Sequence, residues 1–358
     1  MKQPVSPMVL RENVLLAPFT TLGVGGPASF FVEAETEAQV VQALEFASVR
    51  NLPVFILGGG SNLVVADSGF QGMVVRIALR GIQHETAGRI VAASGENWDS
   101  LVRQCVDRRL AGIECLSGIP GTVGGTPVQN VGAYGQEVSE VIASVRVLER
   151  KAQKILDLDN AACGFSYRTS LFNGSGRDRY VVLAVAFQLR PGAGPQIAYP
   201  ELQRRFEGRT NKPTLVDVRA AVLRIRQSKS MLLCPGDPDS RSAGSFFKNP
   251  IVSECEARFA EEAAMNRGSS KESSSMPRYP MGDGRVKLSA AWLIEHAGFS
   301  RGYCRGQVGL SSKHALAIIN RGGATAGEIL ALMAEIQAAV DDLFHVKLVP
   351  EPVFVGFG

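Results

Sequence analysis

The 358-residue sequence lacks the cysteine spacings of a zinc site: it has no Cys-x-x-Cys and no tight group of cysteine with histidine. A disulfide framework is not indicated either, since such frameworks belong to short secreted chains dense in cysteine. The six cysteines are scattered along the chain: Cys105, Cys115, Cys163, Cys234, Cys255 and Cys304. We therefore expect no metal ligands and a reducing compartment.

Long apolar runs are also missing. The longest strongly apolar stretch, residues 180–189, is too short to span a bilayer. Residues 1–12 lack the continuous apolar core of a signal peptide. The net charge of +4 is mild, and no long basic run or regular interleaving of basic and aromatic residues is present. These absences predict a soluble, cytoplasmic protein with no membrane insertion and no nucleic-acid partner.

Glycine, in contrast, is concentrated in two segments. Residues 118–135 hold six glycines and two prolines, which no ordinary helix or strand contains. A second segment, residues 58–63, reads Gly-Gly-Gly-Ser-Asn-Leu and directly follows the apolar run at 54–57. Glycine lets backbone N–H groups approach an anion or a flat ring, because it has no Cβ and tolerates positive φ. Two such loops indicate a large phosphate-bearing cofactor.

Strand and helix signals alternate in the first part of the chain, which predicts an α+β fold with a mixed sheet. The length predicts two or three domains. Capping patterns predict helices that begin after Thr36 and Asn97, the second of which ends near Gly112. The strands are predicted at 29–33, 54–57, 73–79, 89–94, 141–149 and 180–189.

The amino-acid composition changes near residues 204–213, where polar residues precede a helix capped by Thr214. We place a domain boundary there. Residues 266–284 are rich in serine, glycine and proline and predict a mobile surface insertion, because they carry too few apolar residues to offset the entropy of ordering. A capping box at Thr325 opens a last helix, and residues 353–357 form a closing strand.

The segment from Gly23 to Ala28 matches Gly-x-Gly-x-x-Ala, the pattern of a dinucleotide-binding turn. That turn must follow a strand and open a helix. Here Pro27 is followed by strand-like residues instead, so the context favours a turn between short strands.

Taken together, the motifs resemble the UDP-N-acetylenolpyruvoylglucosamine reductases, flavoenzymes of peptidoglycan precursor synthesis. The resemblance runs from about Leu15 to Phe357. Within the family, the chain resembles the tyrosine-loop subgroup. The ordered motifs that carry it are residues 20–26, 57–63, 117–135, 166–168, 243–250, 291–295 and 350–351.

The resemblance implies an FAD-binding fold of the vanillyl-alcohol-oxidase (PCMH) type, in which two subdomains precede a C-terminal α+β substrate domain. We expect the first FAD-binding subdomain at 1–80, with the strand at 346–358 returning to it. The second is expected at 81–205 and the substrate-binding domain at 206–345. The implied reaction is NADPH-dependent reduction of UDP-N-acetylglucosamine enolpyruvate to UDP-N-acetylmuramate through FAD.

This reaction needs a cation for the substrate carboxylate and a proton donor. Three residues are candidates for these roles. Arg168 suits the carboxylate, although isolated arginines also form structural salt bridges. Ser245 is implied as the proton donor, although a serine also serves as a cap or turn residue. Glu351 stands between two prolines and is implied to assist, as an acid or as a carboxylate; an exposed surface carboxylate is the alternative.

For the substrate, the resemblance implies contacts from Tyr199, Lys229 and Asn249. Pro200 leaves the conformation of the tyrosine loop open, and Lys229 also suits the C-terminus of a helix. FAD is expected to bind noncovalently, and no metal is expected. The implied FAD contacts are Gly58, Gly59, Gly60, Ser61, Asn62, Leu63, Gly118, Pro120, Gly121, Thr122, Gly124, Gly125, Gln129, Asn130, Gly132, Ala133 and Tyr134.

Two other functions remain in competition at this point. An FAD oxidase of the same wider fold would act on an alcohol or hydroxy acid, and the matched positions Arg168, Ser245 and Glu351 argue against it. A catalytically silent nucleotide-binding protein would bind ligand without redox turnover, and the same filled positions argue against decay. We expect a monomer.

Overall fold

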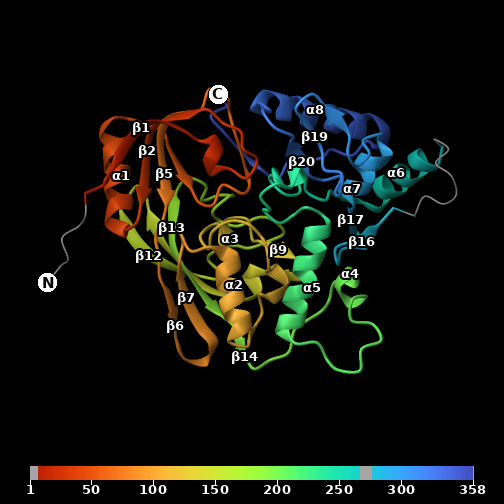
Figure 1. The fold of residues 1–358 in the computed structure, drawn as a ribbon, viewed down its shortest axis with the longest axis horizontal. Helices are drawn as coiled ribbons and strands as arrows, with labels where there is room; N and C mark the ends of the chain where they lie inside the picture. Colours follow the sequence, from red (N-terminus) through yellow and green to blue (C-terminus); the bar gives the residue numbers. More distant parts are fainter. Residues whose placement is uncertain (1–6, 267–275, 358) are drawn as a thin grey trace. The chain divides into compact units, whose positions relative to one another are not determined.

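The computed structural model describes residues 7–266 and 276–357, which group into two compact units. Unit 1 comprises residues 7–14, Ala28–Gly60 and Phe70–Leu232, and unit 2 comprises Leu15–Pro27, Ser61–Gly69 and residues 233–357. Both units contain helices and strands, so the predicted α+β class is confirmed (Figure 1). The division into three domains remains a prediction.

A four-stranded sheet in unit 1 has the order β1 (Leu10–Leu15), β2 (Pro27–Ala34), β5 (Phe70–Ile77) and β3 (Val54–Leu57). Strands β2 and β3 both run parallel to β5. Helix α1 (Glu37–Val49) follows β2, and the Thr36 hydroxyl accepts a hydrogen bond from the N–H of Gln39 as the sequence predicts. The turn at Gly23 leads into a strand rather than a helix, which confirms the rejection of a dinucleotide-binding turn.

The second sheet of unit 1 is antiparallel, with the order β12 (Lys154–Asp159), β11 (Ile142–Glu149), β13 (Tyr180–Gln188), β7 (Arg89–Ala93) and β6 (Ile82–His84). The register against β11 shifts within β13, where Leu183 is the extra residue of a bulge. A bulge reverses the alternation of side chains. Val181 and Leu183 therefore pack with α1, whereas Val185 packs with α2 (Trp98–Asp107) on the other face.

One expectation for unit 1 was wrong. Helix α2 ends at Asp107 rather than near Gly112, because Arg109 adopts a left-handed φ of 56° two residues later. Helix α5 (Leu215–Ser228) begins at the predicted cap, Thr214, and packs against α2 within unit 1, while the domain boundary at 204–213 remains a prediction. The shorter elements of unit 1 are β8 (Leu110–Ala111), α3 (Gly125–Val128), β9 (Gly132–Ala133), β10 (Gln136–Glu137), β14 (Arg190–Pro191) and α4 (Pro200–Gln203).

Unit 2 is held together by a core to which distant parts of the chain contribute. Strand β4 (Leu63–Val65) pairs in parallel with β21 (Val353–Val355), so the C-terminal strand returns to an early segment. The two small antiparallel sheets are β15 (Ile251–Ser253), β17 (Arg285–Leu288) and β16 (Arg278–Pro280), and β18 (Cys304–Arg305), β19 (Val308–Leu310) and β20 (Ile318–Asn320). The helices are α6 (Glu254–Asn266), α7 (Ala290–His296) and α8 (Ala326–Phe344), the last beginning at the predicted capping box of Thr325.

The predicted mobile insertion at 266–284 is partly wrong. Residues 278–280 form strand β16 and pair with β17, and Met276 is buried at 3% exposure. Residues 267–275 lie outside the described part of the chain. All six cysteines are free. Across residues 7–266 and 276–357, no helix combines the length and the apolar character needed to cross a bilayer.

Candidate active site

The two glycine loops meet in unit 1. A Cβ on Gly59 would lie 2.5 Å from the Cα of Gly121, and a Cβ on Gly58 would lie 3.0 Å from the Thr122 hydroxyl. The backbones therefore approach more closely than any side chain would permit at Gly59. The first predicted loop is divided between the units, because Gly58–Gly60 belong to unit 1 and Ser61–Leu63 to unit 2.

Where they face each other, the two loops present unused backbone donors. Within the described chain, the N–H groups of Gly59, Gly60, Gly121 and Thr122 donate to no other group of the protein. Buried backbone N–H groups are nearly always satisfied, and Gly60 is buried. Unused N–H groups on two adjoining loops suit the oxygen atoms of a phosphate. These residues thus fit a phosphate-bearing cofactor.

The second loop is anchored to the N-terminus of helix α2. The N–H of Gly118 donates to Asp99 Oδ1 at 2.6 Å, and the Trp98 N–H donates to the Gly121 carbonyl at 3.2 Å. Asp99 also receives two hydrogen bonds from the Arg219 guanidinium of α5, at 2.6 and 2.8 Å. Burial acts to raise the pKa of Asp99, but the hydrogen bonds from Arg219 and Gly118 outweigh it and hold this pKa below its usual range. The carboxylate therefore fixes the start of the loop.

The middle of this loop differs from the predicted irregular backbone, because residues 125–128 form the single turn of α3. The Gly124 N–H donates to the Ser94 carbonyl, and a Cβ on Gly124 would lie 2.5 Å from Ser94 Cβ. Asn130, a predicted FAD contact, is buried, and its side-chain amide forms hydrogen bonds within unit 1. It donates to Glu137 Oε2 and accepts from the Ser139 N–H. Its side chain therefore shapes the loop.

The side chain of Arg168 contacts the second glycine loop, residues 118–135. It sits in the turn between residues 166 and 169 with a left-handed φ of 55°. Its Nη2 donates to the Gly132 carbonyl at 2.7 Å, and Nη1 lies 3.5 Å from the Asn130 carbonyl. Asn173 fixes the turn by donating to the Arg168 carbonyl at 3.1 Å. Unit 1 thus brings the predicted catalytic arginine to the predicted cofactor loop, which are 36 residues apart in the chain.

The predicted substrate residue Tyr199 contacts the end of the same loop. Its ring meets the edge of the Tyr134 ring with the centroids 5.6 Å apart. Pro200 settles the open question about this segment: it occupies the first turn of α4, and Tyr199 before it is extended, with φ −81° and ψ 127°. Burial raises the pKa of Tyr134 to about 12 despite the nearby Arg226 guanidinium, so the phenol stays protonated at neutral pH.

Lys229 caps the C-terminus of α5, and its Nζ donates to Glu201 Oε2 of α4 at 2.7 Å. Both side chains are about one-third exposed, at 30% and 29%. The ion pair joins α4 to α5 two residues after Tyr199. The cap position agrees with the structural alternative for Lys229. The predicted contact of its ammonium with a diphosphate stays a prediction.

In unit 2, backbone pairing brings Ser245 and Glu351 together although 106 positions separate them in the sequence. The Glu351 N–H donates to the Phe246 carbonyl at 2.9 Å, and Phe247 pairs with Pro350. Asn62 joins them, because its Nδ2 donates to the Glu351 carbonyl at 3.2 Å. Three predicted site residues from three regions of the sequence therefore share one end of unit 2.

The side chain of Ser245 is half-buried beside an apolar core. The next two residues, Phe246 and Phe247, are 0% and 1% exposed and pack edge to face, so they exclude water on that side as the sequence predicts. The Ser245 hydroxyl makes no hydrogen bond within residues 7–266 and 276–357. It can therefore donate its proton to a ligand.

Asn249 has a structural contact that the sequence did not reveal. Its Oδ1 accepts the N–H of Ala290 at 3.0 Å, at the beginning of α7. Among residues 7–266 and 276–357, its amide nitrogen has no acceptor, and its contact with substrate stays a prediction. Among the described residues, no group of histidine, cysteine and acidic side chains has the arrangement of a metal site.

Two residues important to the loop were missed from the sequence, namely Asp99 and Arg226. Arg226 is 7% exposed, and its guanidinium donates to the carbonyls of Gly118 and Met231. Burial lowers the pKa of Arg226. The signal that could have found Asp99 is its place as the acidic residue in the first turn of α2. Nothing local distinguishes Arg226 from the other arginines of α5.

Two models of known protein families match this chain. Residues 28–158 match the family model described as an FAD binding domain. Residues 237–355 match the model of the C-terminal domain of UDP-N-acetylenolpyruvoylglucosamine reductase. The predicted FAD-binding fold is therefore confirmed.

Whole-length relatives have the same description. The chain is 49% identical over 352 residues to a UDP-N-acetylenolpyruvoylglucosamine reductase of Thermobifida fusca, covering 96% of this chain and 98% of that protein. A relative of the same description in Streptomyces coelicolor is 46% identical over 356 residues, with 98% and 92% covered. The crystal structure of the reductase from Thermus caldophilus is similar along 98% of this chain and 100% of that one, with a TM-score of 0.66 and 26% identity.

Proposed function

The chain belongs to the UDP-N-acetylenolpyruvoylglucosamine reductase family, and we propose that it carries out the reaction for which the family is named. It is an FAD-containing oxidoreductase that uses NADPH to reduce UDP-N-acetylglucosamine enolpyruvate to UDP-N-acetylmuramate, a step of peptidoglycan precursor synthesis. The observation that carries the proposal is 49% identity along nearly the whole chain to a named reductase. The arrangement of Ser245 with Glu351 and of Arg168 on the cofactor loop supports it.

The facing loops of unit 1 supply the phosphate contacts of FAD in this proposal. Four N–H groups without a partner in the described chain, on Gly59, Gly60, Gly121 and Thr122, donate to the diphosphate. Bound FAD would supply the redox chemistry, namely the relay of hydride from NADPH to the substrate. The remaining predicted contacts, Ser61, Asn62 and Leu63 of unit 2 and residues 118–134 of unit 1, stay proposals.

Arg168 is proposed to hold the carboxylate of the enolpyruvyl group. Hydride addition to the terminal carbon of the C=C bond leaves an electron pair that spreads over the neighbouring carbon and the carboxylate. A guanidinium remains charged at all relevant pH values and matches the two oxygens of a carboxylate. The contacts to the Gly132 and Asn130 carbonyls hold this guanidinium at the cofactor loop.

Ser245 is proposed to give the proton that completes the reaction. Its hydroxyl proton is transferred to the carbon beside the carboxylate, so the C=C bond gains one hydride and one proton and becomes a lactyl ether. A hydroxyl is a weak acid, but an enolate carbon is basic enough to take its proton. Glu351, held beside Ser245 by the Phe246 carbonyl, is placed to assist that transfer.

The nucleotide-sugar part of the substrate is assigned to Tyr199, Lys229 and Asn249. The Tyr134–Tyr199 contact and the Lys229–Glu201 ion pair support a defined position for two of them. We further propose that the protein acts in the cytoplasm, where NADPH and nucleotide sugars are made, and that it acts as a monomer. Six free cysteines support a reducing compartment. Light scattering coupled to gel filtration measures the oligomeric state.

The test of the reaction is product formation. We expect NADPH oxidation by the purified protein to require UDP-N-acetylglucosamine enolpyruvate, and the product to be heavier than the substrate by two hydrogen atoms in mass spectrometry. In D₂O, the carbon beside the carboxylate acquires deuterium, because the proton from Ser245 exchanges with solvent. Oxidation of NADPH at the same rate without this substrate, with oxygen as the acceptor, would contradict the proposal and favour an oxidase.

A further inference from the structure

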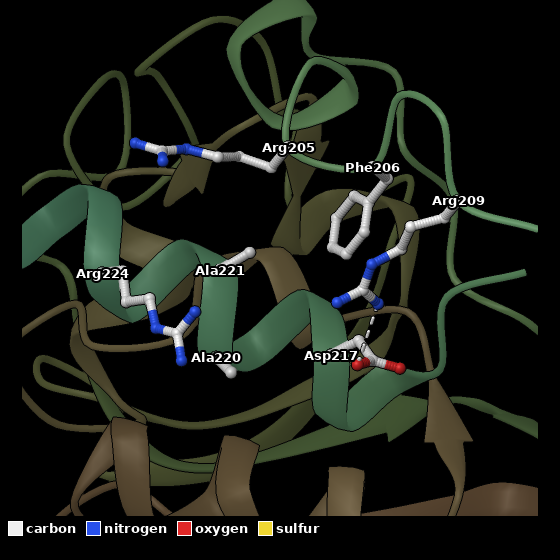
Figure 2. A pocket seen from close by; sticks show the side chains of 7 residues that line it. All are labelled: Arg205, Phe206, Arg209, Asp217, Ala220, Ala221 and Arg224. Carbon is white, nitrogen blue, oxygen red and sulfur yellow. Dashed lines mark hydrogen bonds and ion pairs between the residues drawn. The ribbon is translucent and has the colours of Figure 1, made fainter. Parts of the chain in front are cut away.

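A small pocket of unit 1 contains none of the residues assigned to cofactor or substrate. It has a volume of about 260 Å³ and lies between the segment that follows α4 and the outer face of α5 (Figure 2). The segment after α4 contributes Arg205, Phe206 and Arg209, and helix α5 contributes Asp217, Ala220, Ala221 and Arg224. Pockets for drug-sized ligands measure about 300–1,000 Å³, so this one fits a single small molecule.

The charge of the pocket is positive and only partly compensated. Arg209 pairs with Asp217 at 3.2 Å. Hydrogen bonds from Thr214 lower the pKa of Asp217 to about 2, so this carboxylate is ionised and committed to the helix cap and to Arg209. Within the described residues, Arg205 and Arg224 pair with no carboxylate. Two guanidinium groups are therefore available to an anion.

The unpaired arginines and the ion pair occupy different sides of the pocket. Figure 2 shows Arg205 and Arg224 on one side and the Arg209–Asp217 pair on the other. The methyl groups of Ala220 and Ala221 and the half-buried ring of Phe206 complete the lining. The Arg209 guanidinium lies over the Phe206 ring, 5.2 Å from its centroid, and the rest of this apolar lining is offered to a flat group.

We propose that this pocket binds a nucleoside monophosphate, with the phosphate on Arg205 and Arg224 and the base against Phe206. Guanidinium groups bind phosphate through charge-assisted hydrogen bonds, and bases pack well on aromatic rings. A dinucleotide or a nucleotide sugar exceeds the available volume. The pocket is therefore a separate site and not a further part of the FAD or substrate contacts.

Occupancy has a path to the proposed substrate contacts. Phe206 and Ala221 pack against a buried cluster of Cys115, Leu202, Val218, Val222 and Ile225. Tyr134 and Tyr199 pack against the same cluster. A nucleotide against Phe206 therefore acts on the packing that positions Tyr199, and we expect it to change KM for the UDP-sugar more than kcat. This consequence rests on the proposed function; the binding does not.

The binding test is isothermal titration of the FAD-loaded protein with AMP, without NADPH or substrate. We expect one saturable site. Arg205→Gln and Arg224→Gln should each weaken it about tenfold, because each removes a charge-assisted contact. Arg204→Gln is the matched control, since Arg204 is exposed and adjacent in sequence but does not line the pocket. It should change the affinity less than about twofold.

Two further titrants separate the phosphate from the ring. Inorganic phosphate should bind at least about tenfold more weakly than AMP, and Phe206→Leu should weaken AMP but not phosphate. Equal affinity for AMP and phosphate would overturn the assignment of a nucleotide. No saturable AMP binding, AMP affinity unchanged by the Arg205→Gln and Arg224→Gln variants, or equal losses in Arg204→Gln would overturn the site itself.

Discussion

Unit 1 builds its part of the proposed active site mainly from backbone, whereas unit 2 builds its part mainly from side chains. In unit 1, the facing loops around Gly59 and Gly121 offer N–H groups, and Asp99 holds one end of the second loop. In unit 2, pairing of the strand-like segments at 246–248 and 349–351 brings the backbone of Glu351 against Phe246, the residue after Ser245. The difference is that a cofactor cradle tolerates few residue types, while a proton donor depends on one atom.

This difference predicts how substitutions will behave. Changes in unit 1 should act on cofactor affinity and stability, and changes at Ser245 should act on the chemical step alone. Mutants that separate FAD binding from turnover therefore test this difference between the units.

The largest effect is expected for Ser245→Ala. We expect FAD binding and flavin reduction by NADPH to remain within about twofold of wild type, while reoxidation by substrate falls about 10²- to 10⁴-fold, because only that half-reaction needs the proton. Stopped-flow absorbance measures the two halves separately. Ser300→Ala, which removes an exposed hydroxyl of the same unit, is the control. Wild-type reoxidation in Ser245→Ala would remove Ser245 from the mechanism.

The next effect is expected for Gly59→Ala. Its Cβ would lie 2.5 Å from the Cα of Gly121, so the loops must separate. We expect FAD affinity to fall about 10- to 100-fold, from the strain of overpacking. Fluorescence titration of the apoprotein measures it. Gly194→Ala adds the same methyl group where nothing lies within 4 Å, and should bind FAD like wild type. Equal affinities in both variants would show that the loops do not bind the cofactor by close approach.

A smaller effect is expected at Lys229, where two roles compete. If the ammonium contacts the diphosphate, Lys229→Gln should raise KM for the UDP-sugar about tenfold and leave kcat within about twofold. Glu201→Gln removes the same ion pair but keeps the ammonium, so its KM should stay near wild type. Similar kinetics and similar losses of Tm in both variants would instead assign Lys229 a structural role only.

The smallest effect is expected for Asp99→Asn, and it depends on pH. The pKa of Asp99 is depressed in the folded state, so its stabilisation is present above the unfolded value of about 3.9 and is lost as pH falls through the folded value. At pH 7 we expect the free energy of unfolding to drop by about 1–3 kcal/mol relative to wild type. The difference should shrink below about pH 4. Asp107→Asn, an exposed carboxylate of the same helix, is the control in urea titrations.

Much of the fold was predictable because its signals are local. The β3 boundaries and the caps at Thr36, Asn97, Thr214 and Thr325 agree with the structure, since each depends on residues within a few positions. The end of α2 was missed because Arg109, not a glycine, takes the left-handed conformation. A strand at 278–280 was missed because its partner, β17, supplies the stability that its composition lacks.

The candidate site was predictable to a different degree in the two units. The glycine loops could be found from composition alone. A residue with a Cβ could not take the place of Gly59, because its backbone lies so close to Gly121. Ser245 and Glu351 have no such local signal, and their roles came from resemblance to a family. Their pairing joins residues far apart in the sequence. The anchoring residues Asp99 and Arg226 were missed for the same reason, since tertiary contacts alone give them their roles.

The most direct test of the account is an anaerobic visible spectrum of the FAD-loaded protein during sequential additions. The account predicts that NADPH bleaches the flavin band and that UDP-N-acetylglucosamine enolpyruvate restores it, with one substrate consumed for each flavin reoxidised. A protein that takes up no FAD, or a flavin that stays reduced after this substrate is added, would contradict the proposed reaction.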